Sequence, residues 1–246
     1  MRHLTSALVG LLVLTSPLSG QQTTVIARDS GATMPRWHVG FAVDAGRPVG
    51  GLKRHVANAA GVQAHLLLRI DRRGQTALRL QAGWLNHGHE SQRDCLGGST
   101  GCRVAVNLST TNNVFSVALG PEWSVPAGSF RLYAHGLVGV SRFATLSALA
   151  GGLLPDLVAA DENFGDAGFL WSGGLGIQRV VFKRTAVDIG VAYQGHGRRA
   201  YLTKGGITDN PDGSLGFDIK RSAADLLAFR IGFSTALAWG TPRSTP

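Results

Sequence analysis

The sequence of 246 residues predicts an all-β fold, in which eight antiparallel strands close into one up-and-down barrel. Three observations lead to this prediction. Apolar and polar residues alternate through eight segments with the period of two that β-strands show. The connections between these segments are alternately short and long. All five tryptophans lie near segment ends and on the apolar parity of their segments.

The alternating segments have 10 to 16 residues, so each is long enough for the roughly 9 to 11 residues that a tilted strand needs to cross a bilayer. The last segment is the clearest, because Phe229, Ile231 and Phe233 share one parity. The eight predicted strands are 36–46, 62–71, 76–86, 113–124, 130–142, 167–181, 185–196 and 224–239.

The connections predict which side of the membrane each end of the barrel faces. Short connections at 72–75, 125–129 and 182–184 alternate with long ones at 47–61, 87–112, 143–166 and 197–223. Barrels of the bacterial outer membrane combine short periplasmic turns with long extracellular loops. The third long connection is apolar at 146–158. We expect it to extend a strand and to fold a short helix over the rim, either as a cap or as an exposed patch for a hydrophobic partner.

The tryptophans indicate where the bilayer lies. An indole ring combines an apolar body with an N–H group that prefers water, and the two rims of a bilayer supply both environments. With the first strand running outward, the predicted aromatic girdle consists of Trp37, Trp123 and Trp239 at the periplasmic rim and of Trp84, Trp171 and Tyr193 at the outer rim.

The start of the chain predicts export. A basic tripeptide precedes an apolar stretch at 4–18 and two small residues, which is the pattern of a secretory signal peptide at 1–20. A polar linker at 21–35, the barrel at 36–239 and a short tail at 240–246 complete the predicted organisation. No later segment is apolar for long enough to form a transmembrane helix.

The composition agrees with one large β domain. The chain contains 34 glycines, and its mean hydropathy of +0.09 fits a barrel with one apolar and one polar face. The formal charge is +9, or +8 without Arg2. No Lys/Arg block exceeds two residues, so we expect scattered loop charge and no nucleic-acid partner. An affinity for anionic headgroups or lipopolysaccharide phosphates is the alternative interpretation.

The polar parity is rich in glycine and in charges of both signs, which suits the narrow interior of an eight-stranded barrel. We expect these side chains to pair, fill the lumen and set the strand register; an ion path is the alternative. A soluble lipocalin-like barrel would instead place its apolar parity inside, around a ligand. The predicted interior polar core consists of Arg69, Asp71, Arg79, Glu122, Arg131, Asp188 and Arg230.

On these features, the chain resembles the small eight-stranded outer-membrane barrels of the OmpA-transmembrane, OmpX and opacity type. The resemblance covers about 36–239 and rests on the signal, the strand number, the connection lengths and the aromatic belts. It implies the fold and an outer-membrane location. Members of this group usually end at an aromatic residue, whereas here seven residues follow Trp239.

The second long connection contains the candidate sites. Cys95 and Cys102 predict a disulfide, since the chain is exported. His87, His89 and Glu90 could bind a divalent ion, and the adjacent Ser91 invites a hydrolase interpretation. Neighbouring loop residues rarely give the required geometry, so we expect no metal, no cofactor and no catalytic set.

The sequence therefore predicts a monomeric, non-enzymatic barrel with a structural, adhesion or surface-interaction role through its long loops. Its expected partners are outer-membrane lipid, lipopolysaccharide and a surface ligand. The two alternatives are a lipid-A-modifying enzyme and a soluble ligand-binding barrel.

Overall fold

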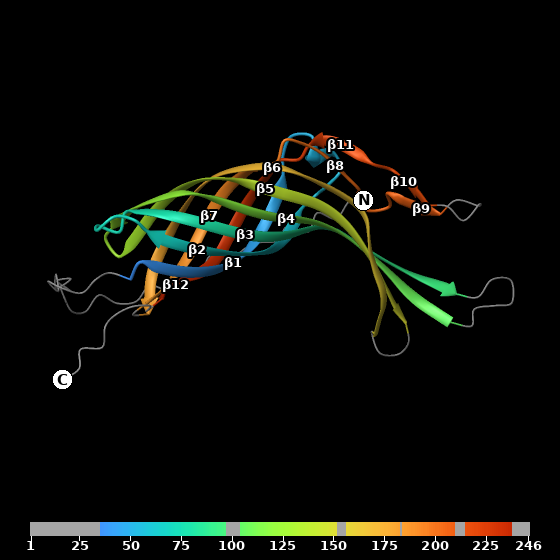
Figure 1. Cartoon of the computed structure of the whole chain (residues 1–246), viewed down its shortest axis with the longest axis horizontal. Coiled ribbons are helices and arrows are strands. Elements are labelled where there is room, and N and C mark those ends of the chain that lie inside the picture. The colour runs from blue at the N-terminus through green and yellow to red at the C-terminus, as the bar shows by residue number, and fades with distance from the viewer. Residues whose placement is uncertain (1–34, 97–103, 152–155, 183, 210–214, 238–246) are drawn as a thin grey trace, which may run out of the picture. The chain divides into compact units, whose positions relative to one another are not determined.

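The computed structural model describes residues 35–96, 104–151, 156–182, 184–209 and 215–237. Within them, eight antiparallel strands form a closed barrel with the ring order β1-β12-β7-β6-β5-β4-β3-β2 (Figure 1). Each strand pairs with its neighbours along the barrel, and β12 pairs with β1 to close the ring. The predicted fold class is confirmed. The barrel strands are β1 (Trp37–Pro48), β2 (Ala59–Arg69), β3 (Thr76–Leu96), β4 (Val104–Ala127), β5 (Phe130–Gly151), β6 (Asp156–Phe182), β7 (Thr185–Gly195) and β12 (Leu226–Leu237).

Four strands are much longer than the sequence predicted. β3, β4, β5 and β6 have 21, 24, 22 and 27 residues, and they occupy most of 87–112 and 143–166, which were expected to be long connections. The expected extension of a strand into 146–158 is confirmed for the described residues of that range. The prediction ended each strand at the length that crosses a bilayer. The structure continues the same ladders further, as far as the pairs Leu96–Val104 and Gly151–Asp156. Thr110 and Thr111 favour this extension because β-branched residues suit strands.

The short connections between barrel strands lie at one end of the barrel. Gly74 and Gly128 have φ values of 66° and 63° there, a backbone conformation that glycine adopts without strain. We call the other end, where the long connections lie, the mouth.

The first long connection contains a 3₁₀ helix, η1 (Leu52–Arg54). The fourth contains β8 (Arg198–Tyr201), β9 (Ile207–Asp209), β10 (Leu215–Phe217) and β11 (Lys220–Ala223), which pair as β8 with β11 and β9 with β10. The short helix expected within 143–166 is wrong for the described residues of that range, which are strand. The described residues contain no helix that is long and apolar enough to cross a membrane.

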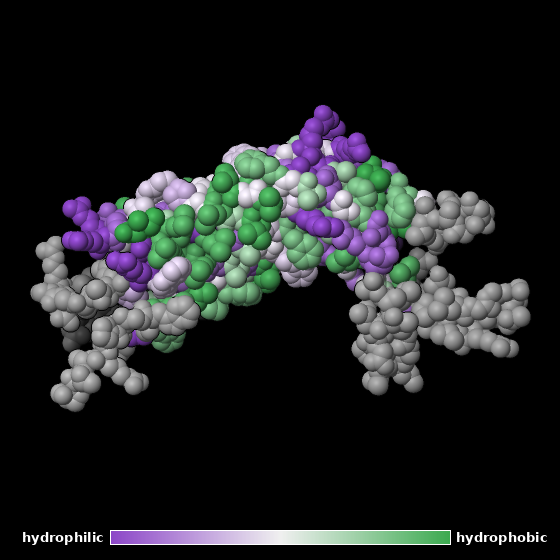
Figure 2. Space-filling model, viewed as in Figure 1, coloured by the Kyte–Doolittle hydropathy of each residue, from purple (hydrophilic) through white to green (hydrophobic). Residues whose placement is uncertain are grey.

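The burial of side chains alternates along the barrel strands. In β1, Gly40, Ala42 and Asp44 are buried, whereas Phe41 and Val43 are exposed. The space-filling view shows a hydrophobic band on the barrel wall with hydrophilic residues toward its ends (Figure 2). The apolar parity therefore faces outward, as predicted, and the lipocalin-like alternative is excluded.

A hydrophobic cluster occupies the mouth. Leu52 of η1 and Tyr201 of β8 are almost fully buried there against residues of the barrel wall. The first and fourth long connections therefore fold over the lumen and pack into it. This mouth cluster consists of Leu52, Val56, Ala59, Leu85, Val114, Phe143, Tyr201, Ala224 and Leu226.

Candidate functional site

A buried ion pair occupies the barrel interior between β3 and β4. Arg79 is 0 % exposed, and its Nη1 donates to Oε2 of Glu122 at 2.6 Å. Its Nε donates to Oε1 of Gln81 at 3.0 Å. Alternation places all three side chains on the inner face, where a buried charge needs both a counter-ion and hydrogen bonds.

A second network connects four consecutive strands of the ring, β12, β7, β6 and β5, on the inner face. Nη2 of Arg230 on β12 donates to the Tyr133 hydroxyl of β5 at 2.6 Å. That hydroxyl donates to Oδ1 of Asp188 on β7 at 2.7 Å, while Nε2 of Gln178 donates to the other oxygen at 2.9 Å. Nε of Arg230 also lies 3.7 Å from Oδ1 of Asp188. One tyrosine thus lies against Gly176 of β6 and Gly190 of β7 and links the two charges along the inner wall.

The remaining predicted core residues lie near the short turns. Arg131 Nη1 donates to the carbonyl of Gly74 at 2.9 Å, and Arg69 Nη1 donates to the same carbonyl. Asp71 does not lie in the interior, which corrects the prediction. It lies in the turn after β2 and accepts the backbone N–H groups of Thr76 and Gln75 at 2.8 and 3.1 Å. These hydrogen bonds lower the pKa of Asp71, and the one from Thr76 has the largest effect.

This interior leaves no role for the charges as a wide ion path. An eight-stranded barrel is only wide enough for side chains to fill it. Arg79, Glu122, Asp188 and Arg230 are all at most 3 % exposed, and each has a partner on another strand. These four residues therefore form a buried, paired polar core in the lumen.

The predicted girdle residues fall near two levels of the barrel. Trp37 pairs with Leu237, and Trp123 pairs with Thr76, near the short turns. Trp84 pairs with Val62, and Trp171 pairs with Gly195, nearer the mouth. The Trp171 ring lies 5.2 Å from that of Tyr193. Trp239 lies outside the described residues.

The histidines of the second long connection are not brought together as a metal site. The His87 ring points into the mouth cluster, 6.1 Å from the Phe143 ring and 6.4 Å from the Tyr201 ring. His89 and Ser91 are exposed, and Glu90 accepts the backbone N–H of Gly205 at 2.8 Å. Within the described parts of the chain, no three His, Cys, Asp or Glu side chains cluster as metal ligands. The predicted disulfide joins Cys95 and Cys102. Cys102 and the side chain of Cys95 lie outside the part of the chain that the structure describes.

A serine–histidine pair that the sequence did not reveal lies beneath the mouth cluster. Oγ of Ser141 and Nδ1 of His196 are 2.8 Å apart. This is the distance expected between a nucleophile and its base. The two side chains are, however, only 2 % and 1 % exposed, so a substrate has no access to them. The residues are 55 positions apart, and the pairing of β5 and β7 on the two sides of β6 brings them together.

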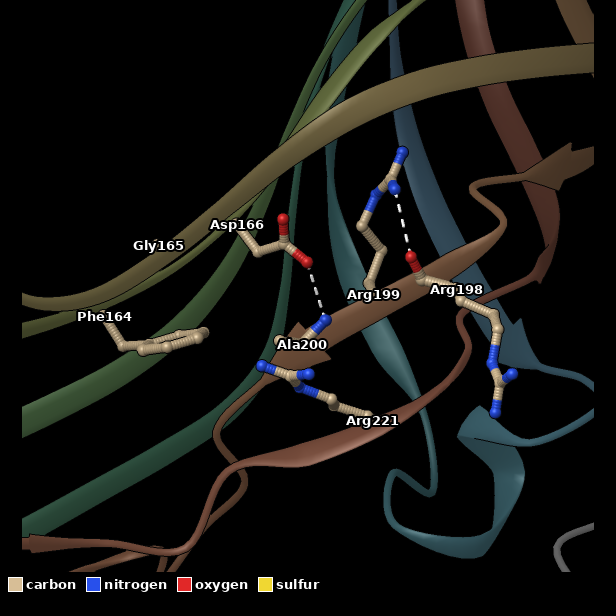
Figure 3. A pocket seen from close by; sticks show the side chains of 7 residues that line it. All are labelled: Phe164, Gly165, Asp166, Arg198, Arg199, Ala200 and Arg221. Atoms are coloured by element: carbon tan, nitrogen blue, oxygen red, sulfur yellow. Dashed lines mark hydrogen bonds between the residues drawn. The ribbon is translucent and has the colours of Figure 1, made fainter.

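An arginine-rich pocket lies at the mouth, between β6 and the β8–β11 pair (Figure 3). It has a volume of about 600 Å³. Asp166 Oδ2 accepts the backbone N–H of Ala200 at 2.7 Å, which fixes β8 against β6. The sequence does not reveal this site, because the connection 197–223 shows no strand pattern. We call it the arginine pocket, and its lining residues are Phe164, Gly165, Asp166, Arg198, Arg199, Ala200 and Arg221.

Comparison with known proteins found similarity only among solved structures. No protein-family model and no curated protein matches the sequence. Neisserial surface protein A has 9 % identity and a TM-score of 0.47, over 82 % of this chain and 97 % of that one. The attachment invasion locus protein of Yersinia pestis, in complex with the heparin analogue sucrose octasulfate, has 10 % identity and a TM-score of 0.40, over 81 % and 95 %. A major outer membrane protein of Thermus thermophilus has 15 % identity and a TM-score of 0.39, over 80 % and 98 %.

The solved structures to which this chain is similar thus include an outer membrane protein. Their TM-scores lie below 0.5, and we draw no argument about function or binding sites from them.

The Tyr133 bridge can be tested through a glycine beside it. A Cβ at Gly176 would overlap the Tyr133 hydroxyl. We expect Gly176→Ala to displace that ring, disrupt its bonds to Arg230 and Asp188, and lower the free energy of unfolding by about 1–3 kcal/mol. Denaturant unfolding in detergent measures this loss. Gly173→Ala on the same strand is the control, because no heavy atom lies within 4 Å of its added carbon. Equal losses in both variants would argue against the bridge.

The mouth cluster should loosen in acid. Burial lowers the pKa of His87 to about 4. Burial is also the largest cause that lowers the pKa of His196 to about 4, whereas a histidine in the unfolded chain has a pKa near 6.5. Both side chains are thus neutral when folded at pH 7. As the pH falls below 6.5, the unfolded state gains protons first, and each histidine costs roughly 2 kcal/mol of stability at pH 5.

Amide hydrogen exchange of Tyr201 and Leu226 between pH 7 and pH 5, corrected for intrinsic exchange rates, measures this loosening. His87→Phe should reduce the pH dependence, while His89→Phe, at an exposed position, should leave it unchanged. A pH-independent protection would contradict the assignment.

Proposed function

We propose that this chain is a monomeric, non-enzymatic barrel of the bacterial outer membrane, which presents its mouth and long strands for interactions at the cell surface. The observation that carries the proposal is the inverted distribution of polarity. Large apolar side chains cover the outside of the wall, while Arg79, Asp188 and Arg230 are buried inside. An apolar outer wall is stable in hydrocarbon and would aggregate in water.

The tryptophan levels support a position for the bilayer. Trp37 and Trp123 near the short turns and Trp84 and Trp171 nearer the mouth would lie at the two interfaces. The short turns would then face the periplasm. Exposed Arg72 and Arg73 in such a turn could contact anionic headgroups, so outer-membrane lipid is a proposed partner.

The strand extensions support a role outside the membrane. β3 continues from Trp84 to Leu96, which is roughly 30 Å of tilted strand beyond the proposed outer interface. β4, β5 and β6 remain paired with one another along similar extensions. A paired sheet of this length offers a firm surface for a ligand or for adhesion.

Catalysis and conduction are not favoured by the described interior. The hydrogen-bonded Ser141–His196 pair is buried beneath the mouth cluster, out of reach of lipid A or another substrate. The mouth cluster and the ion pairs also occupy the lumen. We therefore expect no conductance above background in planar bilayers.

Two outward isoleucines test the membrane assignment. Ile231 and Ile70 are similarly exposed, at 63 % and 66 %, but Ile231 lies midway along β12 and Ile70 in the turn after β2. Ile231→Arg should lower the unfolding free energy in lipid vesicles by about 2–4 kcal/mol, and Ile70→Arg by only about 0–1 kcal/mol. In water, both positions would accept arginine with little cost. Near-equal stability of the two variants in vesicles would therefore overturn the outer-membrane proposal.

A further inference from the structure

The arginine pocket combines cations from both strands of the β8–β11 pair. Arg198 and Arg199 belong to β8, and Arg221 belongs to β11, where it pairs with Ala200. Figure 3 shows the Arg221 guanidinium and the Phe164 ring pointing toward one another across the pocket. Arg199 turns back to β6, where its Nη2 donates to the carbonyl of Phe169 at 2.7 Å.

The arginines of the pocket lack counter-ions in the described structure. No carboxylate there lies within ion-pair distance of Arg198, Arg199 or Arg221, and the guanidinium groups of Arg198 and Arg221 form no hydrogen bond with a described residue. The three arginines and the single carboxylate of Asp166 leave a formal charge of +2, from three positive charges and one negative.

The neighbouring acidic groups do not cancel this charge. Glu162 forms an ion pair with Arg142 at 2.6 Å, and Asp218 forms one with Lys220 at 2.5 Å. Each of these pairs is formally neutral. The charge of +2 therefore remains concentrated on the wall of the pocket, where it favours an anion.

We propose that the arginine pocket binds a phosphate monoester carried by a sugar. A phosphate monoester has a charge of roughly −1.5 to −2 at pH 7, which matches the +2 of the pocket, whereas a carboxylate or a sulfate ester has only a single charge. Guanidinium groups also fit phosphate oxygens through paired N–H donors. Arg198 and Arg221 are exposed, so both can turn to the anion.

The rest of the pocket suits the sugar. A volume of about 600 Å³ lies within the range of roughly 300–1,000 Å³ that small-molecule sites occupy. The Phe164 ring offers an apolar face for the C–H groups of a pyranose, and Asp166 offers a carboxylate oxygen to its hydroxyl groups. A bare phosphate would use only the arginines.

This inference rests on the proposed outer-membrane location, which leaves two sources for such a ligand. Asp166 lies five residues from Trp171 along β6, roughly 12 Å above the proposed interface. Phosphorylated sugars of lipopolysaccharide in the surrounding leaflet would lie near this level. A free sugar phosphate could reach the same pocket from solution.

Calorimetric titration of the full barrel in detergent micelles with glucose 6-phosphate tests the proposal. We expect saturable binding, weaker binding of inorganic phosphate, and no binding of glucose. Arg221→Gln should weaken glucose 6-phosphate binding roughly 10- to 100-fold, the effect of losing a charge-assisted hydrogen bond. Arg54→Gln on η1 removes an exposed guanidinium outside the pocket and should change the affinity by less than about twofold.

Competition with lipopolysaccharide in phosphatidylcholine vesicles identifies the source. Displacement of glucose 6-phosphate by intact but not by dephosphorylated lipopolysaccharide assigns the site to the membrane glycolipid. No displacement assigns it to a soluble sugar phosphate, and both results retain the proposed ligand chemistry. Equal binding of glucose, or an equal loss in Arg54→Gln and Arg221→Gln, would overturn it.

The stability of Ile231→Arg and Ile70→Arg in vesicles separates this inference from the proposed function. A barrel that passes that test and does not bind glucose 6-phosphate refutes the pocket alone. Near-equal stability of Ile231→Arg and Ile70→Arg refutes the membrane location, whether or not the pocket binds glucose 6-phosphate.

Discussion

The pairing of β1 with β12 is the constraint on which the rest of this structure depends. Its ladder runs from Trp37–Leu237 to Pro48–Leu226 and removes both edges of the sheet. Closure satisfies the backbone hydrogen bonds within the wall, so the wall can meet hydrocarbon. It also creates a narrow interior, in which Arg79 and Arg230 must find partners on other strands. The outward apolar band and the inward ion pairs are therefore two consequences of one ring.

The two ends of the barrel differ in structure and in the role that we propose for them. At the short turns, tight connections with Gly74 and Gly128 keep the strands in order. At the mouth, η1 and the β8–β11 pair fold over the lumen and leave the arginine pocket between the β8–β11 pair and β6. The wall thus supplies rigidity, while the first and fourth long connections supply the chemistry that a ligand would meet.

Alternation made the barrel predictable from sequence, because a period of two decides which side chains share a face. It placed Arg79, Glu122, Asp188 and Arg230 on the inner parity, where the structure has them. It could not give the ends of the strands: the ladders of β3 to β6 continue past bilayer length, and Asp71 lies in a turn. The arginine pocket was beyond reach because it depends on the folding of the fourth connection. The Ser141–His196 pair was beyond reach because its two residues meet only through the register of β5 and β7 on the two sides of β6.

The extension of β3 to β6 as a paired sheet affects how such a surface can change in evolution. A flexible loop tolerates insertions and deletions, because its neighbours need not keep a register. In the ladder from Gly88–Asn112 to Ser91–Ser109, one inserted residue would move every following side chain to the opposite face unless it formed a bulge like the irregularity between Asn86 and Gly88. Diversification of this surface would therefore proceed by substitution at alternate positions, so that related chains would differ in side chains and keep their strand lengths.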